Sequence, residues 1–192
     1  DIMEKRTMKT VFAAKEVLEM LGWNPSRENI QLEFVCVPSL NGLHVKKIGK
    51  YVNIEYSSIP FLCRSIGIAF EHRTEDFDIE ETSIFDTDGI MIDCSRGAVM
   101  KVSAVKKLIC RLALMGCDTV MLYTEDTYEL PDEPYFGYMR GRYSESEICE
   151  IDDYAFKFGI EIIPCIQVLG HLSKPLEWSV YSEITDVPGV LL

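Results

Sequence analysis

The stretch VSAVKKLICRLALMGCDTVMLY, residues 102–123, decides the fold class of this chain. Its first part repeats apolar residues at the spacing of one helix face, and Gly116 follows as a helix-ending residue. Residues 119–123 form a short apolar run, which is typical of a strand that is buried on both faces of a parallel sheet. The stretch therefore predicts a helix that leads directly into a buried strand, the repeating unit of α/β folds.

The same unit recurs on both sides of this stretch. Residues 89–92 are predicted as an earlier buried strand. Further along, Ser144 and Glu147 have the spacing of a capping box, the helix that they open ends at Gly159, and residues 160–166 form a third strand. Apolar strands that alternate with amphipathic helices predict a parallel α/β sheet over residues 86–192.

Residues 1–85 show a different pattern, which predicts a small α+β domain. Two segments have apolar residues at helical spacing, and three read as strands. The predicted helices are residues 8–21 and 59–70, and the predicted strands are residues 31–37, 51–56 and 79–85. We find no motif in this domain that indicates a chemical activity.

The composition narrows the class of partner. The net charge is −12, which argues against nucleic acid as a partner because phosphate binding needs clustered Lys and Arg. The apolar runs are too short to span a membrane, so no membrane partner is predicted. The first residue is Asp1 and the last three are Val190, Leu191 and Leu192, so both ends look cut.

The cysteines bear on the cellular compartment. There are seven, an odd number at irregular spacing without a C-x-x-C motif, which is neither a zinc pattern nor a disulfide framework. No signal peptide is recognisable at the N-terminus. We therefore predict reduced cysteines and a cytoplasmic location.

Polar residues follow each of the three predicted strands. Asp93 and Arg96 follow the first strand, Glu125 and Asp126 the second, and His171 the third. The carboxyl ends of parallel strands meet at one edge, where both barrels and doubly wound sheets bind their ligands. These residues are therefore candidates for a functional site. No glycine-rich phosphate loop follows any of the strands, which disfavours a nucleotide-binding fold.

A long loop, residues 123–143, is the most informative part of this edge. It interleaves aromatic residues with carboxylates and carries Arg140 and Arg142 near its end. Aromatic faces pack on the apolar face of a sugar, and carboxylates accept hydrogen bonds from its hydroxyls. Packing within the loop is the competing interpretation for each tyrosine. Arg96 is a candidate either for substrate contact or for a salt bridge at the rim.

Three segments, in order, resemble family 20 glycoside hydrolases, the β-N-acetylhexosaminidases. Residues 88–96, DGIMIDCSR, are similar to the first-strand segment of that family. Residues 120–128, VMLYTEDTY, resemble the second, which ends in an acidic pair, and residues 163–171, IPCIQVLGH, resemble the third, which ends in Gly-His. The resemblance implies that residues 86–192 are the first three strands of an incomplete TIM-type (β/α)₈ barrel, and that residues 1–85 are the small α+β domain that precedes it.

The resemblance also implies a reaction. Enzymes of this family remove terminal β-linked N-acetylglucosamine or N-acetylgalactosamine with retention, and the acetamido oxygen of the substrate attacks the anomeric carbon. Their catalytic Asp-Glu pair ends the fourth strand, after a His-x-Gly-Gly-like segment that this chain lacks. We therefore predict no catalytic residue within the chain and no activity for the chain alone. No metal or organic cofactor is implied.

A supporting shell is implied as well. Glu125 is expected to hydrogen-bond His171, which in the family contacts the general acid. The expected substrate-binding residues are Asp88, Arg96, Asp126, Tyr128 and Arg140. Many family members have, in place of Asp88, an Arg that binds the C3 and C4 hydroxyls of the sugar. A carboxylate also accepts hydrogen bonds from hydroxyls, so the change is expected to alter the preference between gluco and galacto sugars.

Two other interpretations stay open. One is a catalytically inactive barrel of the same fold that binds a sugar or a protein, and the other is an unrelated α/β-barrel hydrolase. The expected partners are glycans or glycoconjugates with terminal N-acetylhexosamine, and a homo-oligomer is a possible assembly. Three strands cannot close a barrel, so we also expect an unpaired strand edge, exposed apolar surface and self-association.

Overall fold

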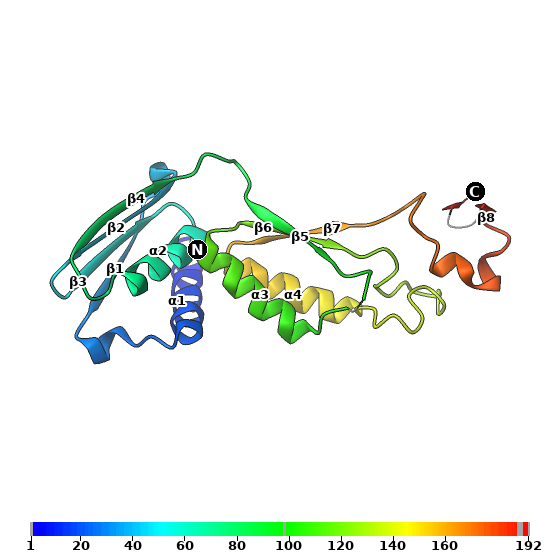
Figure 1. Ribbon diagram of the computed structural model, residues 1–192, viewed down its shortest axis with the longest axis horizontal. Helices are drawn as coiled ribbons and strands as arrows, with labels where there is room; N and C mark the ends of the chain where they lie inside the picture. The colour runs from blue at the N-terminus through cyan, green and yellow to red at the C-terminus, as the bar shows by residue number, and fades with distance from the viewer. Residues whose placement is uncertain (1, 98, 188–189, 192) are drawn as a thin grey trace.

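A computed structural model of the chain describes residues 2–97, 99–187 and 190–191, with side chains described for residues 7–97 and 99–187. The molecule is elongated, with the first sheet at one end, the second sheet over a layer of helices in the middle, and the C-terminal segment at the other end (Figure 1). Asp1 and Leu192, on which the interpretation of the two ends partly rested, lie outside the described residues.

The first sheet is formed by the N-terminal half of the chain. Its strands are β1 (Gln31–Cys36), β2 (Gly42–Ile48), β3 (Tyr51–Tyr56) and β4 (Phe77–Thr82), in the order β1-β3-β2-β4. β1 and β3 are parallel, and the other two pairings are antiparallel. Two helices, α1 (Ile2–Leu21) and α2 (Ile59–Glu71), complete this part. The predicted α+β character is present, but β2 was not predicted as a strand.

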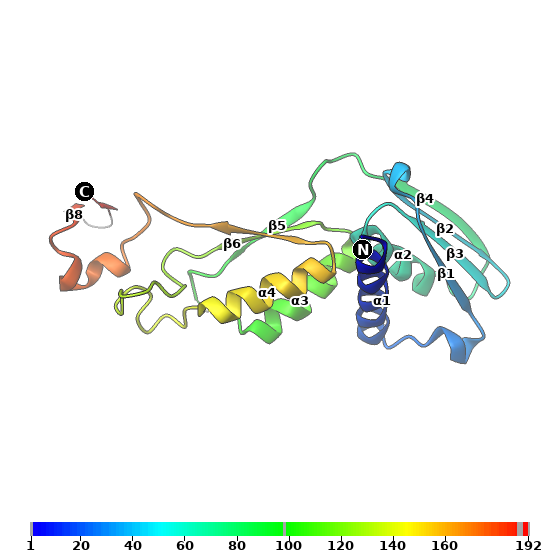
Figure 2. The same cartoon turned by 180° about the vertical axis from the view of Figure 1, so that it is seen from behind.

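The second sheet is parallel, as the sequence predicts. Its strands are β5 (Gly89–Asp93), β6 (Thr119–Tyr123) and β7 (Glu161–Cys165), paired in that order. α3 (Val102–Met115) and α4 (Glu145–Lys157) are the crossover helices, and both lie on the same side of the sheet (Figure 2). Beyond β7, the chain forms a short antiparallel pair of β8 (Thr185–Val187) and β9 (Val190–Leu191). The short 3₁₀ helices of the described residues are Pro25–Glu28, Pro38–Leu40, Pro175–Glu177 and Ser179–Tyr181.

The ends of α3 and α4 carry the capping features that the sequence predicts. The Ser144 hydroxyl accepts the backbone N–H of Glu147, and the Glu147 carboxylate accepts the N–H of Ser144 at 2.9 Å, which confirms the capping box. Gly116 ends α3 with φ of +90°, a conformation that side chains larger than glycine adopt at a cost. These ends fix where each helix turns back toward the next strand.

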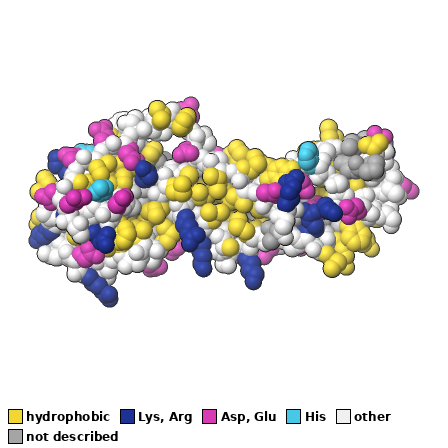
Figure 3. Space-filling model, in the orientation of Figure 1, with side chains coloured by type: hydrophobic (Ala, Val, Ile, Leu, Met, Phe, Trp, Pro, Cys, Tyr) yellow, Lys and Arg dark blue, Asp and Glu magenta, His cyan; other side chains and the backbone are white. Residues whose placement is uncertain are grey.

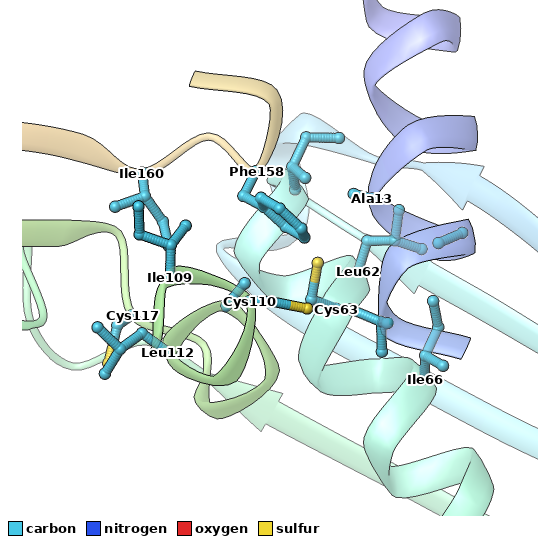
Figure 4. Packing of buried hydrophobic residues seen from close by; sticks show 14 of the residues in the cluster. Ala13, Leu62, Cys63, Ile66, Ile109, Cys110, Leu112, Cys117, Phe158 and Ile160 are labelled. Carbon is cyan, nitrogen blue, oxygen red and sulfur yellow. The ribbon is translucent and has the colours of Figure 1, made fainter. Parts of the chain in front are cut away.

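The two parts of the molecule share one hydrophobic core. α2 packs against α3. Cys63 of α2 faces Cys110 of α3, and Phe158 lies close to both (Figure 4). Phe158 is fully buried and contacts the ring of Phe12 on α1, with 5.6 Å between the ring centroids. The division into domains at residues 1–85 and 86–192 stays a prediction, because the core runs through both.

The second sheet leaves apolar surface uncovered. Within the part of the chain that the structure describes, β5 and β7 each pair along one edge only, and on β5 the side chain of Met91 is 57% exposed. Hydrophobic side chains accordingly gather over the middle of the molecule in the space-filling view (Figure 3). The expected unpaired edge and exposed apolar surface are present, while self-association stays a prediction. Within the described residues, no helix combines the length and apolar content needed to cross a bilayer.

The burial of Phe158 predicts a large effect of truncation. Phe158→Ala should lower the free energy of unfolding by about 3–5 kcal/mol, because it leaves a cavity where α1, α2 and the end of α4 meet. Urea denaturation followed by circular dichroism measures the change. Phe156→Ala is the matched control, since that ring is 63% exposed and its removal should change stability by less than about 1 kcal/mol. Equal effects of the two substitutions would contradict the packing described here.

Candidate functional site

The carboxyl ends of β5, β6 and β7 open into a pocket of about 560 Å³. Basic, acidic and His side chains gather beyond this end of the sheet, in contrast to the apolar middle of the molecule (Figure 3). The lining residues come from three separate strand-following segments, because parallel strands end at the same edge. Those that carry polar or charged side chains are Ser95, Arg96, Glu125, Thr127, Arg140, His171, Ser173 and Lys174.

Arg96 connects the first segment to the second. Its guanidinium donates to the Asp93 carboxylate at 2.8 Å and to the Glu125 carboxylate at 3.1 Å. It also lies over the ring of Tyr123, with 5.3 Å between the guanidinium carbon and the ring centroid. The hydrogen bond from Arg96 holds the pKa of Asp93 down to about 2. Arg96 is 59% exposed in its side chain, so it keeps hydrogen-bond donors available to a ligand in the pocket.

Glu125 is held in an unusual backbone conformation. Its φ is +49°, in the left-handed region that non-glycine residues rarely adopt. The side chain of Gln167, from the segment after β7, accepts the backbone N–H of Glu125 at 2.7 Å and thereby stabilises this turn. As a result the Glu125 carboxylate accepts hydrogen bonds from Arg96 and Tyr123 and lines the pocket. The residue is only 7% exposed.

Asp126 lies behind the pocket lining and pairs with Arg140. The residue is 2% exposed. Its Oδ1 lies 3.4 Å from the Arg140 guanidinium, which makes an ion pair, but the angle between them does not allow a hydrogen bond. Burial raises the pKa of Asp126, and the positive charge of Arg140 opposes that rise. Arg140 also donates to the backbone carbonyl of Ser95, so it joins the long loop to the segment after β5.

His171 lines the same pocket as Glu125. The predicted hydrogen bond between them is absent from the interactions of the described residues, in which the Glu125 carboxylate receives Arg96 and the Tyr123 hydroxyl. His171 is exposed and has φ of +61°, and the chain around it forms a bend that leaves the ring at the rim. The structure thus places the two residues at one pocket, and their relay stays a prediction.

Asp88 does not line this pocket, so its predicted contact with the sugar stays a prediction. It precedes β5 at the amino end of the strand, and its carbonyl accepts the backbone N–H of Asp118 at 2.8 Å. Five residues of extended strand separate it from the pocket, a distance of roughly 16 Å. Arg96, at the other end of β5, is the residue of this segment that reaches the pocket.

Tyr128 is also outside the pocket lining. Its ring packs against Phe136 with 5.1 Å between centroids, and its backbone forms an isolated bridge with Tyr143. Burial raises the pKa of the Tyr128 hydroxyl. For this tyrosine, packing within the loop is therefore the interpretation that the contacts support. Other rings of the loop, Tyr135 and Tyr138, pack on Trp178 from the C-terminal segment.

Sequence reasoning missed several pocket residues. Ser95 lines the pocket, while Gln167 lies outside its lining and accepts the backbone N–H of Glu125. Both lie in the quoted strand-following segments but carry no charge that singled them out. Ser173 and Lys174 come after His171, where no pattern predicted proximity. Among the described residues, no group of three or more His, Cys, Asp or Glu side chains is arranged to hold a metal ion. The site is therefore a polar pocket of guanidinium, carboxylate and hydroxyl groups, which suits a ligand with many hydroxyls.

Comparison with known proteins identifies the fold. No family model and no curated protein matches the chain. The solved family 20 exo-β-N-acetylglucosaminidase of Vibrio harveyi, in complex with N-acetylglucosamine, matches 96% of this chain and 37% of its own with a TM-score of 0.74 and 18% identity.

Two Streptomyces enzymes are similar in the same way. The family 20 β-N-acetylhexosaminidase of Streptomyces coelicolor A3(2) matches 84% of this chain and 39% of its own, with a TM-score of 0.67 and 20% identity. The N-acetyl-β-hexosaminidase of Streptomyces plicatus matches 85% of this chain and 39% of its own, with a TM-score of 0.66 and 21% identity. The chain has a fold found within these family 20 hydrolases and spans about two fifths of their length.

The Arg96–Asp93 pair predicts a measurable titration. Arg96→Gln should raise the pKa of Asp93 from about 2 toward its ordinary value near 3.8, because the first cause of the depression is the hydrogen bond from Arg96. Since the folded-state pKa is lowered, the stability that the pair contributes is present above pH 3.8 and is lost as the pH falls through 2. Carboxyl carbon NMR during an acid titration measures the shift. Arg111→Gln, on the exposed side of α3, should leave the Asp93 pKa unchanged.

Two glycines of the long loop form a matched pair. Gly137 and Gly141 both have φ of +67°, so Ala at either position costs about 1 kcal/mol of backbone strain. A Cβ at Gly137 would also lie 2.2 Å from the carbonyl oxygen of Asp126, whereas one at Gly141 has Val99 at 3.8 Å. Gly137→Ala should therefore lower stability by about 1–3 kcal/mol more than Gly141→Ala in thermal or urea unfolding. Equal losses would show that the loop does not lie against Asp126 as described.

Proposed function

We propose that the chain is the front part of a family 20 β-N-acetylhexosaminidase, comprising a small α+β domain and the first three strands of a (β/α)₈ catalytic barrel. The observation that carries the proposal is the Arg96–Glu125–Arg140 cluster at the carboxyl ends of β5 and β6. In a barrel of this type the substrate binds at that face. The similarity of the fold to family 20 hydrolases supports the same assignment.

The proposed reaction is hydrolysis of a terminal β-linked N-acetylhexosamine with retention. The acetamido oxygen of the substrate attacks the anomeric carbon, the bond to the leaving oxygen breaks, and a general acid gives that oxygen a proton. Water then opens the cyclic intermediate. The Asp that orients the acetamido group and the Glu that gives the proton lie, in this proposal, on later strands outside the present chain, so the chain alone is inactive.

The residues of this chain would bind and orient the sugar. Arg96 presents guanidinium donors to the sugar hydroxyls, and the Glu125 carboxylate fixes the direction of that guanidinium. Arg140 keeps the charge of Asp126 paired where burial raises its pKa. We also propose that His171 turns toward Glu125 when the general acid is present, which would give the relay that the sequence predicts.

The remaining assignments belong to the same proposal. The partners are glycans or glycoconjugates with terminal N-acetylhexosamine, and the location is cytoplasmic. All seven cysteines are free in the structure, which fits a reducing compartment. An inactive sugar-binding barrel is the second candidate, favoured by the exposure of Arg96 at the pocket independently of any catalytic pair.

A fluorogenic N-acetyl-β-glucosaminide is the substrate that tests the proposal. The product of the whole gene should hydrolyse it, with the plain β-glucoside and the 192-residue chain as controls that show no hydrolysis. Arg96→Gln in the long protein should lower kcat/KM at least about tenfold, because a charged hydrogen bond to substrate is lost. Arg111→Gln is the matched control and should leave kcat/KM unchanged.

The outcomes separate the candidates. Absence of hydrolysis by the folded long protein, with retained binding of N-acetylglucosamine, would favour the inactive sugar-binding barrel. Equal hydrolysis of the plain β-glucoside would contradict the assignment, because a substrate without the acetamido group cannot supply the attacking oxygen.

A further inference from the structure

A second hollow, of about 840 Å³, lies between α1, the turn that precedes α2 and the end of α4, and we call it the α1–α4 groove. In Figure 2, α1 lies in front, beside α2 and near one end of α4. The groove shares no lining residue with the pocket at the strand ends. Its lining residues are Met8, Lys9, Phe12, Cys36, Tyr56, Ser57, Ser58, Ile59, Phe156 and Lys157.

The groove leaves large apolar side chains in contact with water. Met8 is 67% exposed and Phe156 is 63% exposed, although both lie beside the buried core. Exposed apolar surface costs free energy in proportion to its area, so a ligand that covers these side chains gains affinity from their burial. The apolar side chains of the lining therefore favour a ligand with a large apolar part.

Two ammonium groups give the groove a charge opposite to that of the whole chain. The Lys9 Nζ lies 3.2 Å from the centroid of the Phe156 ring, and the Lys157 Nζ lies 5.0 Å from that of Phe12. Among the residues whose side chains the structure describes, the lining contains no Asp or Glu, in a chain that has 31 of them. No ion pair joins either lysine to a carboxylate of the described residues. Burial lowers the pKa of Lys9, which an anionic ligand would reverse.

We propose that the α1–α4 groove binds a free fatty acid, with the alkyl chain along Met8, Phe12 and Phe156 and the carboxylate between Lys9 and Lys157. The binding is non-covalent, and the two ammonium groups provide the charge complementarity that selects a single anionic head group. This inference does not rest on the proposed glycosidase function, because the groove and the pocket at the strand ends lie on different elements.

The charge requirement is tested by titration calorimetry with dodecanoate below its micelle-forming concentration. The double variant Lys9→Gln/Lys157→Gln should bind about tenfold more weakly than the unchanged chain. Lys15→Gln/Lys107→Gln is the matched control, since it removes the same charge from lysines outside the groove and should leave affinity unchanged. Absence of dodecanoate binding, or equal binding by both double variants, would overturn the proposal.

The apolar requirement is tested with a series of ligands. Affinity should rise from octanoate through decanoate to dodecanoate, by up to about fourfold for each added methylene that is buried. Dodecanol should bind more weakly than dodecanoate, because it lacks the carboxylate. Equal affinity for dodecanol, or binding to anionic phospholipid vesicles without binding of free dodecanoate, would overturn the assignment to a free fatty acid.

Two cysteines locate the ligand. Cys36 lines the groove, whereas the exposed Cys149 lies on α4 in a separate hollow with Lys106 and Glu150. Saturating dodecanoate should slow iodoacetamide labelling of Cys36, measured by peptide mass spectrometry, and should leave labelling of Cys149 unchanged. Equal protection of both cysteines would contradict a site in the groove. Failure of dodecanoate to bind, together with a dimer that Phe156→Ser dissociates in sedimentation velocity, would assign the groove to a second copy instead.

Discussion

The parallel pairing of β5, β6 and β7 is the constraint on which the site depends. Consecutive parallel strands need a crossover, and here each crossover carries one helix, α3 or α4, over the same face of the sheet. The strands therefore all end at one edge. Arg96, Glu125 and His171, which are far apart in the sequence, line one pocket for this reason alone. The ion pair between Arg96 and Glu125 forms on a framework that the strand order has already set.

The sequence predicted the second sheet closely because its signals are local. Residues 119–123 were predicted and found as β6, since a run that is apolar on both faces has few other stable placements. In the first sheet, β2 was missed. It carries Lys46 and Lys47, and its place between β3 and β4 follows from pairing with distant residues rather than from its own pattern. Lys47 is nevertheless 6% exposed, with its stem packed in the sheet.

The candidate site was only partly predictable for a related reason. The position of a residue relative to a strand end decided the outcome: Arg96 and Glu125, after the strands, reach the pocket, while Asp88, before its strand, does not. The bond from Arg140 to the Ser95 carbonyl depends on how the long loop folds back, and no spacing in the sequence encodes that contact. Tyr128 was predicted to bind substrate because it is aromatic, but its ring packs against that of Phe136.

The continuous core between the two sheets has a consequence for how the molecule opens. Cys63 on α2 and Cys110 on α3 belong to one buried cluster that also holds Val52 of β3 and Val120 of β6. Separating the two sheets would expose apolar surface on both at once. Backbone amides of β3 and β6 are then expected to exchange with solvent deuterium through the same cooperative event, with one common free energy. The chain would behave as a single foldon, although its two sheets have different topologies.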